Sequence, residues 1–256
     1  LKLSSGDELR IPPVEVSIGT KISRVSDALA KRLSDSVLYE TQFLLVLNKP
    51  AGISVHGGSG VRLGLLDALR QIKLEWSDLE LAHRLDRDTS GCLLLAKKSC
   101  NLKYLQNEFK LKRVQKRYLA FVHGSWPKGL VKVDAPLLKN EISSGERVVK
   151  VSPNGKEAET HFKILQTYSA ATLMQASPIT GRTHQIRVHC QHAGHSIIGD
   201  QKYGPKGCSE ALKSIKTLCL HASNIEFSDS ASNKLIKIEA PVDKFWQISA
   251  EKIGKK

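Results

Sequence analysis

Several features that mark common classes of protein are missing from this 256-residue sequence. It has no apolar run near the ~18 residues that a membrane-spanning helix needs, and no charged-then-apolar leader that resembles a signal peptide. It also has no internal repeat and no low-complexity tract. We therefore expect a cytoplasmic protein with no membrane partner, long enough for one sizeable domain.

The cysteines and histidines do not form a recognisable metal or disulfide framework. The five cysteines are odd in number and contain no Cys-x-x-Cys pair, which argues against a disulfide scaffold and a zinc ribbon. Four nearby histidines have spacings of 5, 3 and 3 residues, and so lack the His-x-x-x-His pair of a metalloprotease helix. They are His184, His189, His192 and His195. We expect reduced thiols and no metal site.

The glycine-rich stretch at residues 56–60 lacks the residues that would give it a familiar role. It does not end in the Gly-Lys-Ser/Thr of a P-loop, which argues against nucleotide hydrolysis. It resembles the oxyanion loop of esterases, but no Gly-x-Ser-x-Gly elbow follows it. We interpret it as a flexible loop beside the active cleft, where glycine lets the backbone pass close to a partner.

Acidic residues are scarce relative to basic ones. Lys and Arg number 39 against 25 Asp and Glu, which gives a formal net charge of +14 and a pI near 9.6. Eight of the basic residues, with the single acid Glu108, fall between Lys97 and Arg117. Such a concentrated excess favours a polyanionic partner, most commonly a nucleic acid. A merely basic soluble protein is the alternative.

The pattern of apolar residues predicts an α+β fold with a mixed, mostly antiparallel β-sheet flanked by helices and loops. Strands are expected at residues 37–40, 43–49, 91–98, 116–123, 147–151, 160–166, 171–176, 219–227 and 235–240. Helices are expected at residues 25–33, 61–74, 102–109 and 183–192.

The densest group of chemically active residues is the segment HRLDRDTSG at positions 83–91. Asp86 lies there between Arg84 and Arg87, and nearby positive charge keeps a carboxylate ionised. An ionised carboxylate can act as a nucleophile or as a base. A salt-bridge cluster on a surface loop is the alternative interpretation.

A second dense segment, TGRTHQIRVH, occupies positions 180–189. Gly181 ahead of Thr183 predicts a helix N-terminus that suits contact with a phosphate or a carboxylate. Arg187 lies one turn beyond Thr183, so it should project from the same face of that helix.

Four segments occur in the order seen in RluA-type pseudouridine synthases, and the chain resembles that family over roughly residues 37–245. They are NKPAG at 48–52, HRLDRDTSG at 83–91, KRY at 116–118 and TGRTHQIRVH at 180–189. VHGGSG at 55–60 and the stretch at 137–160 resemble the branch of the family that acts on large-subunit ribosomal RNA. The resemblance implies a pseudouridine synthase catalytic domain over residues 37–256, built around a central RNA-binding cleft.

The resemblance also implies roles for individual residues. Asp86 matches the catalytic aspartate, and Arg187 matches the arginine that pairs with it. Tyr118 matches the tyrosine that lies against the target base, and Leu220 would pack near the uracil. Arg84 would enter the space that the flipped nucleotide leaves. The residues expected to contact RNA phosphates are Lys97, Lys98, Lys112, Arg113, Lys116 and Arg182. An Asp86–Arg187 ion pair within about 4 Å is expected, and Asp88 should face away from the cleft.

The implied activity is the isomerisation of specific uridines in 23S ribosomal RNA by a monomer. No cofactor is expected, because the reaction involves no redox change and loses no group. Asp86 could add to the sugar or the base, or remove a proton from C2′. A transfer-RNA enzyme of the same family and a non-catalytic RNA-binding or ribosome-assembly protein are the alternatives. Residues 1–13 resemble the end of an S4-type RNA-binding domain that is mostly absent from the sequence, with residues 14–36 as a linker.

Overall fold

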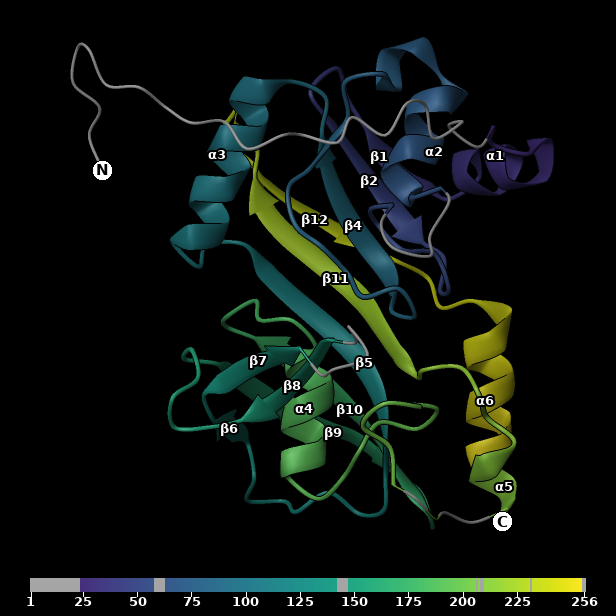
Figure 1. Cartoon of the computed structure of the whole chain (residues 1–256), viewed down its shortest axis with the longest axis vertical. Helices are drawn as coiled ribbons and strands as arrows, with labels where there is room; N and C mark the ends of the chain where they lie inside the picture. The colour runs from purple at the N-terminus through teal and green to yellow at the C-terminus, as the bar shows by residue number, and fades with distance from the viewer. Residues whose placement is uncertain are drawn as a thin grey trace, which may run out of the picture.

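The computed structural model describes residues 24–57, 63–141, 147–205, 207, 210–230 and 232–254. A sheet of ten strands runs through the molecule, and helices pack against it (Figure 1). The expectation of an α+β fold with a mixed, mostly antiparallel sheet is therefore confirmed.

Most predicted strands and helices are present, with small shifts at their ends. The strands are β1 (Val37–Glu40), β2 (Leu44–Lys49), β3 (Glu80–Leu81), β4 (Ser90–Ala96), β5 (Gln115–His123), β6 (Lys132–Asp134), β7 (Leu137–Glu141), β8 (Arg147–Val151), β9 (Glu159–Thr167), β10 (Ala171–Pro178), β11 (Leu220–Ser228) and β12 (Leu235–Glu239). The helices are α1 (Asp27–Ser34), α2 (Leu65–Ile72), the 3-10 turn η1 (Leu74–Trp76), α3 (Ser99–Lys110), α4 (Gln185–His192), α5 (Glu210–Lys213) and α6 (Lys244–Gly254). The sheet order is β1-β2-β4-β11-β5-β10-β9-β6, with β3 beside β4 and β12 beside β11, and β7 and β8 form a separate hairpin.

Two strands far apart in the sequence, β4 and β11, lie side by side in the middle of the sheet and run parallel (Figure 1). The other strand pairs of the described residues are antiparallel. Gly91 permits this contact, because a Cβ atom at that position would collide with the backbone of Ala222. The close approach brings the loop that precedes β4 next to Leu220, where β11 begins.

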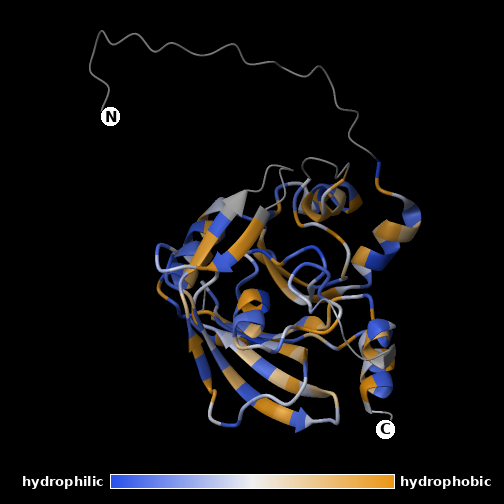
Figure 2. Cartoon of the chain, turned by 60° about the horizontal axis from the view of Figure 1, so that its bottom comes forward, coloured by the Kyte–Doolittle hydropathy of each residue, from blue (hydrophilic) through white to orange (hydrophobic). Residues whose placement is uncertain are grey.

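Burial follows the residue pattern of each strand. β4 is buried along nearly its whole length, as an apolar run in the middle of a covered sheet should be. β10 alternates between buried and half-buried residues over much of its length, and the strands at the bottom of Figure 2 alternate between hydrophobic and hydrophilic colours. The sheet therefore has one extensively covered region around β4 and one region whose outer face is more exposed.

Helix α4 packs between the β7–β8 hairpin and strands β9 and β10 (Figure 1). A small apolar cluster joins these elements, formed by Leu137, Val149, Ala158, Val188 and Tyr203. Because Val188 is a residue of α4, the cluster fixes the position of the helix that carries Arg187.

Two helix predictions need correction. The helix predicted at 61–74 is the shorter α2, because Lys73 has extended backbone angles that separate it from η1. The helix predicted from Thr183 begins at Gln185, because His184 adopts a left-handed conformation with φ of 53°. Thr183 therefore lies outside the helix, and the argument that placed Arg187 on its helical face was wrong.

Some predictions fall on parts of the chain outside the described residues. The S4-like segment at 1–13 and residues 58–60 of the glycine-rich loop are among them. The segment predicted as a linker, 14–36, is described from residue 24 onward and contains α1, whose Leu33 is buried in the main core. The domain boundaries stay a prediction. No helix of the described residues is long and apolar enough to cross a membrane.

Candidate active site

Asp86 lies in the loop between β3 and β4, and this loop is held by the turn that follows β2. The backbone nitrogen of Thr89 donates to the carbonyl of Asp86 at 3.2 Å, which closes a tight turn. The backbone nitrogen of Gly52 donates to the carbonyl of Arg87 at 2.9 Å. The segments NKPAG and HRLDRDTSG, separate in the sequence, are therefore hydrogen-bonded neighbours.

Lys49, a residue that sequence analysis did not single out by itself, strengthens this junction. Its side chain is fully buried, and Nζ donates to the carbonyls of Pro50, Ile53 and Arg87 at 2.9, 2.9 and 3.0 Å. Burial lowers the pKa of Lys49 to about 7, and Asp88 and Asp86 partly offset this effect. Three carbonyl acceptors match the three hydrogens of an ammonium group. Lys49 thus connects the end of β2 to the loop that carries Asp86.

The charge partner of Asp86 comes from α4. Nη1 of Arg187 lies 3.3 Å from Oδ2 of Asp86, although the two residues are 101 positions apart. The predicted ion pair is confirmed. The rest of the guanidinium is held by Asp200, because Nε and Nη2 each donate to its carboxylate at 2.8 Å. The guanidinium also lies over the ring of Tyr203, 5.0 Å from its centroid.

Asp200 and Arg187 stabilise each other's charged forms. Burial raises the pKa of Asp200, but its hydrogen bonds and charge interaction with Arg187 outweigh burial and hold the pKa below its ordinary value. Burial disfavours the charged guanidinium of Arg187, yet Asp200 and Asp86 together raise its pKa. Backbone nitrogens of Lys202 and Tyr203 also donate to Asp200, at 2.9 and 3.0 Å. Arg187 is therefore a fixed, permanently charged partner for Asp86.

The arginines next to Asp86 in the sequence have a different arrangement from the one expected. Nε of Arg87 pairs with Oδ1 of Asp88 at 3.0 Å, on the surface of the loop. Arg84 is exposed. Arg87 is therefore paired with Asp88, and the ion-pair partner of Asp86 is the distant Arg187. Asp88 does not line the cleft that contains Tyr118, but it lines a second cavity together with Asp86.

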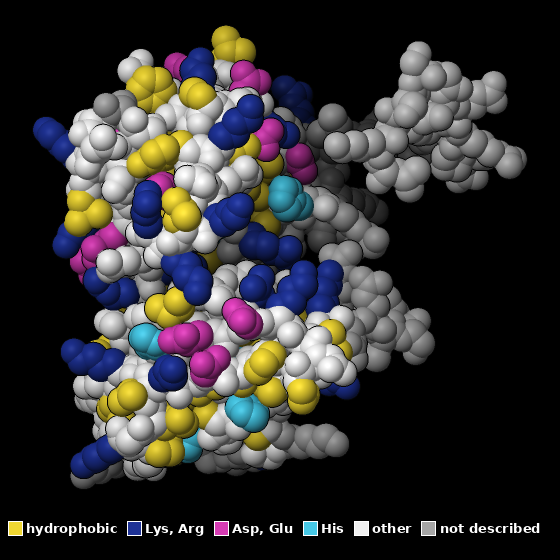
Figure 3. Space-filling model, turned by 90° about the vertical axis from the view of Figure 1, so that its left-hand side faces the viewer, with side chains coloured by type: hydrophobic (Ala, Val, Ile, Leu, Met, Phe, Trp, Pro, Cys, Tyr) yellow, Lys and Arg dark blue, Asp and Glu magenta, His cyan; other side chains and the backbone are white. Residues whose placement is uncertain are grey.

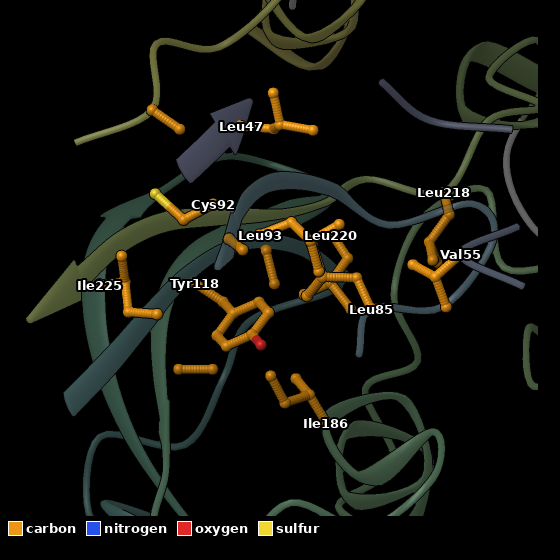
Figure 4. Close-up of a cluster of buried hydrophobic side chains, with 14 of the residues drawn as sticks. Leu47, Val55, Leu85, Cys92, Leu93, Tyr118, Ile186, Leu218, Leu220 and Ile225 are labelled. Carbon is orange, nitrogen blue, oxygen red and sulfur yellow. The ribbon is translucent and has the colours of Figure 1, made fainter. Parts of the chain in front are cut away.

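A cavity of about 480 Å³ opens on one side of Asp86. Tyr118 from β5 and Leu220 from β11 line it, and Figure 4 shows the Tyr118 ring among Leu85, Leu220 and Ile186. Burial raises the pKa of Tyr118, and the charge of Asp86 raises it further, so the phenol stays protonated. This cavity brings together a carboxylate, an aromatic ring and apolar walls, which suit a planar base.

Basic residues surround the same cleft. Figure 3, which draws the left-hand side of the molecule as seen in Figure 1, shows Lys and Arg side chains gathered in a band across its middle. The cleft is lined by Lys110, Lys112, Lys116 and Arg182. Lys116 is half-buried with Nζ 5.8 Å from the centre of the Phe109 ring, and burial lowers its pKa to about 8. The guanidinium of Arg182 donates to the carbonyl of Glu157 at 2.9 Å.

The other three predicted RNA-contacting residues do not line either cavity around Asp86. Lys97 pairs with Glu40 of β1 at 2.6 Å, and its side chain is largely buried. Arg113 pairs with Glu108 at 3.2 Å. Lys98 is exposed and precedes α3. A role for these three in RNA binding stays a prediction, and Lys97 also has a structural contact with Glu40.

A second cavity, of about 1050 Å³, opens on the other side of Asp86. Five residues line both cavities, and they mark the place where the two meet: Arg84, Leu85, Asp86, His184 and Arg187. Asp86 is therefore accessible from both sides. The predicted site residues Asp86, Arg187, Tyr118, Leu220 and Arg84 all line the first cavity.

His184 is a member of the site that sequence analysis considered only as a metal ligand. Its Nε2 lies 4.0 Å from Oδ1 of Asp86, and its Nδ1 lies 2.7 Å from the hydroxyl of Tyr203. Two other histidines of that group have separate partners: His189 contacts Thr160 and the carbonyl of Ala135, and His195 contacts the carbonyl of His123. Within the described ranges, no group of three or more His, Cys, Asp or Glu could hold a metal ion.

Asp200 and Tyr203 were missed because the sequence gives little sign of their role. They lie in a short polar stretch after the buried pair Ile197 and Ile198. A polar turn after an apolar run indicates a loop but not the partner of its carboxylate. Lys49 gave a stronger signal, because it ends an otherwise apolar predicted strand. A lysine in such a place is rarely fully buried unless its ammonium group has partners.

Comparisons with known proteins identify the family of the chain. Residues 43–192 match a protein-family model described as RNA pseudouridylate synthase. Over 249 residues the chain is 50% identical to the ribosomal large subunit pseudouridine synthase C of Salmonella typhi, covering 95% of this chain and 78% of that protein. The protein of the same name from Escherichia coli (strain K12) is 49% identical, with 94% of this chain and 77% of that protein covered.

A solved structure shares the fold. Human RNA Pseudouridylate Synthase Domain Containing 4 superposes with a TM-score of 0.71 at 27% sequence identity. The superposition covers 88% of this chain and 95% of the human chain. The similarity therefore extends over most of the chain, well beyond the segments quoted from the sequence.

Proposed function

The chain belongs to the RNA pseudouridylate synthase family, and from that premise we propose that it isomerises specific uridines of 23S ribosomal RNA with Asp86 as the catalytic carboxylate. The curated relatives that share about half of its residues are named for the large ribosomal subunit, which supports this choice of RNA. The observation that carries the role of Asp86 is its position: a carboxylate held by Arg187 at the meeting point of two cavities.

The reaction requires a site of this kind. The bond between N1 of uracil and C1′ of the ribose breaks, the detached base turns, and a bond forms between C5 and C1′. An enzyme cannot reach the glycosidic bond inside a helical stack, so the target nucleotide must be flipped into a pocket. The cavity with Tyr118 supplies a pocket whose walls suit a uracil ring. The carboxylate of Asp86 then faces the sugar or the base, and its contact with Arg187 orients it.

The other site residues have roles that follow from their surroundings. Tyr118 stacks on the uracil, and Leu220 packs beside it. Arg84, exposed where the two cavities meet, is positioned to enter the space that the flipped nucleotide leaves. Lys112, Lys116 and Arg182 bind phosphates at the mouth of the cleft.

The reaction balances without a cofactor, because no electron is gained or lost and no group leaves. We also assign the activity to a monomer in the cytoplasm, since one chain supplies every residue of the site described above and the proposed RNA is ribosomal. Light scattering coupled to size-exclusion chromatography tests the monomer, and a molar mass of two chains contradicts it.

Mapping of pseudouridine tests the function directly. The protein is incubated with 23S RNA transcribed without modifications, and pseudouridines are located by carbodiimide labelling and primer extension. We expect a small set of modified positions with wild-type protein and none with Asp86→Asn, which keeps the shape of the side chain but removes its charge. Activity of Asp86→Asn within tenfold of wild type would contradict the catalytic assignment.

The same assay distinguishes the alternatives. Modification of a transfer-RNA pool and not of 23S RNA would favour a transfer-RNA enzyme of the same family. RNA binding without any pseudouridine would favour a non-catalytic RNA-binding or ribosome-assembly protein. The Asp86–Arg187 pair argues against the second, because binding alone does not require a carboxylate in a cleft that faces a polyanion.

A further inference from the structure

His184 is held in an unusual conformation at the point where the two cavities meet. Its φ of 53° lies in the left-handed region, which residues with a side chain rarely adopt. Such conformations persist where the surrounding structure fixes them, often at functional sites. His184 directly precedes α4, so the left-handed turn places its ring between Asp86 and Tyr203.

Tyr203 determines which ring nitrogen of His184 carries hydrogen. The Tyr203 oxygen accepts a hydrogen bond from the backbone nitrogen of Val149 at 3.0 Å. The contacts of the described residues offer the hydroxyl hydrogen one acceptor, Nδ1 of His184 at 2.7 Å. Burial lowers the pKa of His184, so the neutral ring predominates at neutral pH. With Nδ1 accepting, the hydrogen of the neutral ring is on Nε2.

The Nε2–H group of His184 faces the carboxylate of Asp86 at a distance that lets one further atom form hydrogen bonds to both. Nε2 lies 4.0 Å from Oδ1, which is too far for a direct hydrogen bond. It is less than twice the ~2.8 Å of a normal hydrogen bond, so one oxygen can contact both atoms. That oxygen must accept from Nε2–H and donate to Oδ1, because a carboxylate only accepts. A hydroxyl group does both. Oδ2 remains with Arg187 at 3.3 Å.

The reaction identifies which hydroxyl of the substrate can lie there. Bond breaking and bond forming both occur at C1′, so a carboxylate that acts in this reaction lies near that carbon. The 2′-hydroxyl is attached to the adjacent carbon, and it is both a donor and an acceptor. The 3′ and 5′ oxygens of an internal nucleotide are esterified to phosphate and have no hydrogen to donate.

We propose that His184 and Asp86 together bind the 2′-hydroxyl of the target uridine, His184 as donor through Nε2–H and Asp86 as acceptor through Oδ1. This inference rests on the proposed function. It makes His184 a substrate-binding residue that recognises ribose in the target nucleotide. Tyr203 is a positioning residue, because it acts by fixing the hydrogen of the His184 ring on Nε2.

Single-turnover rates on two RNA fragments test the proposal. Both fragments carry a site mapped on 23S RNA, with uridine or 2′-deoxyuridine at the target and ribose elsewhere. Wild-type protein should prefer uridine by at least roughly tenfold, because the deoxyuridine target loses both hydrogen bonds of the 2′-hydroxyl. His184→Asn tolerates the left-handed backbone but brings no donor to the same place. It should slow the uridine reaction by roughly fivefold and the deoxyuridine reaction less than twofold, so the preference for uridine narrows but does not vanish, because Asp86 still accepts from the 2′-hydroxyl.

Two further variants separate this role from a structural one. Tyr203→Phe removes the hydroxyl that fixes Nδ1 and keeps the ring beside Arg187, so it should narrow the preference for uridine. A purely structural effect would slow both reactions equally. His192→Asn, on the exposed last residue of α4, should leave both rates unchanged. If His184→Asn fails to fold, Tyr203→Phe tests the proposal through the ratio of its rates on the uridine and deoxyuridine fragments.

Three results would overturn the proposal or its premise. If His184→Asn keeps the wild-type preference for uridine over deoxyuridine, His184 does not bind the 2′-hydroxyl. The same result in Tyr203→Phe has the same meaning if His184→Asn does not fold. Equal wild-type rates on uridine and deoxyuridine exclude the 2′-hydroxyl site too. No pseudouridine from wild-type protein on either fragment instead contradicts the proposed function itself.

Discussion

Asp86 and Asp88 are two carboxylates in one loop, two positions apart, with very different surroundings. The Asp86 side chain is 17% exposed and pairs with Arg187, which comes from a helix 101 residues later. The Asp88 side chain is 41% exposed and pairs with its neighbour Arg87. Surface pairs of the second kind contribute little, about 0–1 kcal/mol, whereas breaking a buried pair costs about 3–5 kcal/mol. The ion pair between the sequence neighbours Arg87 and Asp88 is therefore weaker than the pair between the distant residues Arg187 and Asp86.

The two arginines differ in the same way. Arg187 has Asp200 on two of its nitrogens and the ring of Tyr203 beneath it. The Arg87 side chain is 65% exposed. A guanidinium that is fixed on several sides can orient a catalytic carboxylate, because little of its freedom remains to be lost. This comparison predicts that changes around Arg187 matter far more than changes around Arg87.

Asp200→Asn should have the largest effect of the changes considered below. It leaves the buried Arg187 without its main counter-charge, so the free energy of unfolding should fall by about 3 kcal/mol. Because Asp86 loses a rigid partner, the single-turnover rate should fall roughly a hundredfold. Urea denaturation and rapid-quench assays measure the two effects. Asp134→Asn, which breaks an exposed pair with Lys132, is the control and should change both little. If Asp200→Asn and Asp134→Asn change the stability and the rate equally, the contacts around Arg187 matter no more than an exposed ion pair.

Lys49→Met tests the junction that holds the loop of both aspartates. Methionine keeps the apolar part of the side chain but removes the donor to three carbonyls, of which, among the described residues, only that of Arg87 keeps another donor, the backbone nitrogen of Gly52. The free energy of unfolding should therefore fall by about 2 kcal/mol. The rate should fall roughly tenfold, because the loop of Asp86 is less rigid. Lys31→Met on the exposed surface of α1 is the matched control. A Lys49 variant as stable and as active as this control would show that the junction is dispensable.

The pH dependence of RNA binding should reveal Lys116. Burial lowers the pKa of Lys116 to about 8, and a lysine is charged below its pKa. Between pH 7 and pH 9 the wild-type protein therefore loses this positive charge in the cleft, and its affinity for RNA should fall several-fold. Lys116→Arg stays charged over that range, so its titration curve should be flatter. Lys163→Arg on the exposed side of β9 should keep the wild-type curve. If RNA affinity falls with pH in the same way for all three proteins, deprotonation of Lys116 is not the cause of the fall.

Asp88→Asn should have the smallest effect. It removes the exposed pair with Arg87 and leaves the contacts of Asp86 in place, so activity should stay within about threefold of wild type. The assay is the same single-turnover reaction used for Asp200→Asn. An inactive Asp88→Asn protein with normal folding would mean that the wrong carboxylate has been chosen, because Asp88 also lines the second cavity.

Much of the site could be predicted because its key residues lie in dense segments of the sequence. Asp86 stands in a run of charged residues before an apolar strand, and Arg187 stands in a polar run with an apolar face. Resemblance to a family joined the two, and the structure confirms their ion pair. The predicted start of α4 was wrong, and the partners of Arg87 and Lys97 could not be predicted from the sequence.

The amino-acid sequence is enough to predict the α+β fold class, the apolar strands, the basic character of the protein and the segments that hold Asp86, Tyr118 and Arg187. Local pattern and composition suffice for these features, because burial and charge are properties that each segment carries alone. Three contacts become visible only in the folded protein: Asp200 holds Arg187, Lys49 holds the loop of Asp86, and His184 faces the same carboxylate. Such contacts depend on the orientation of side chains from distant elements, and a hydrogen bond requires agreement to within a fraction of an ångström, which packing alone sets.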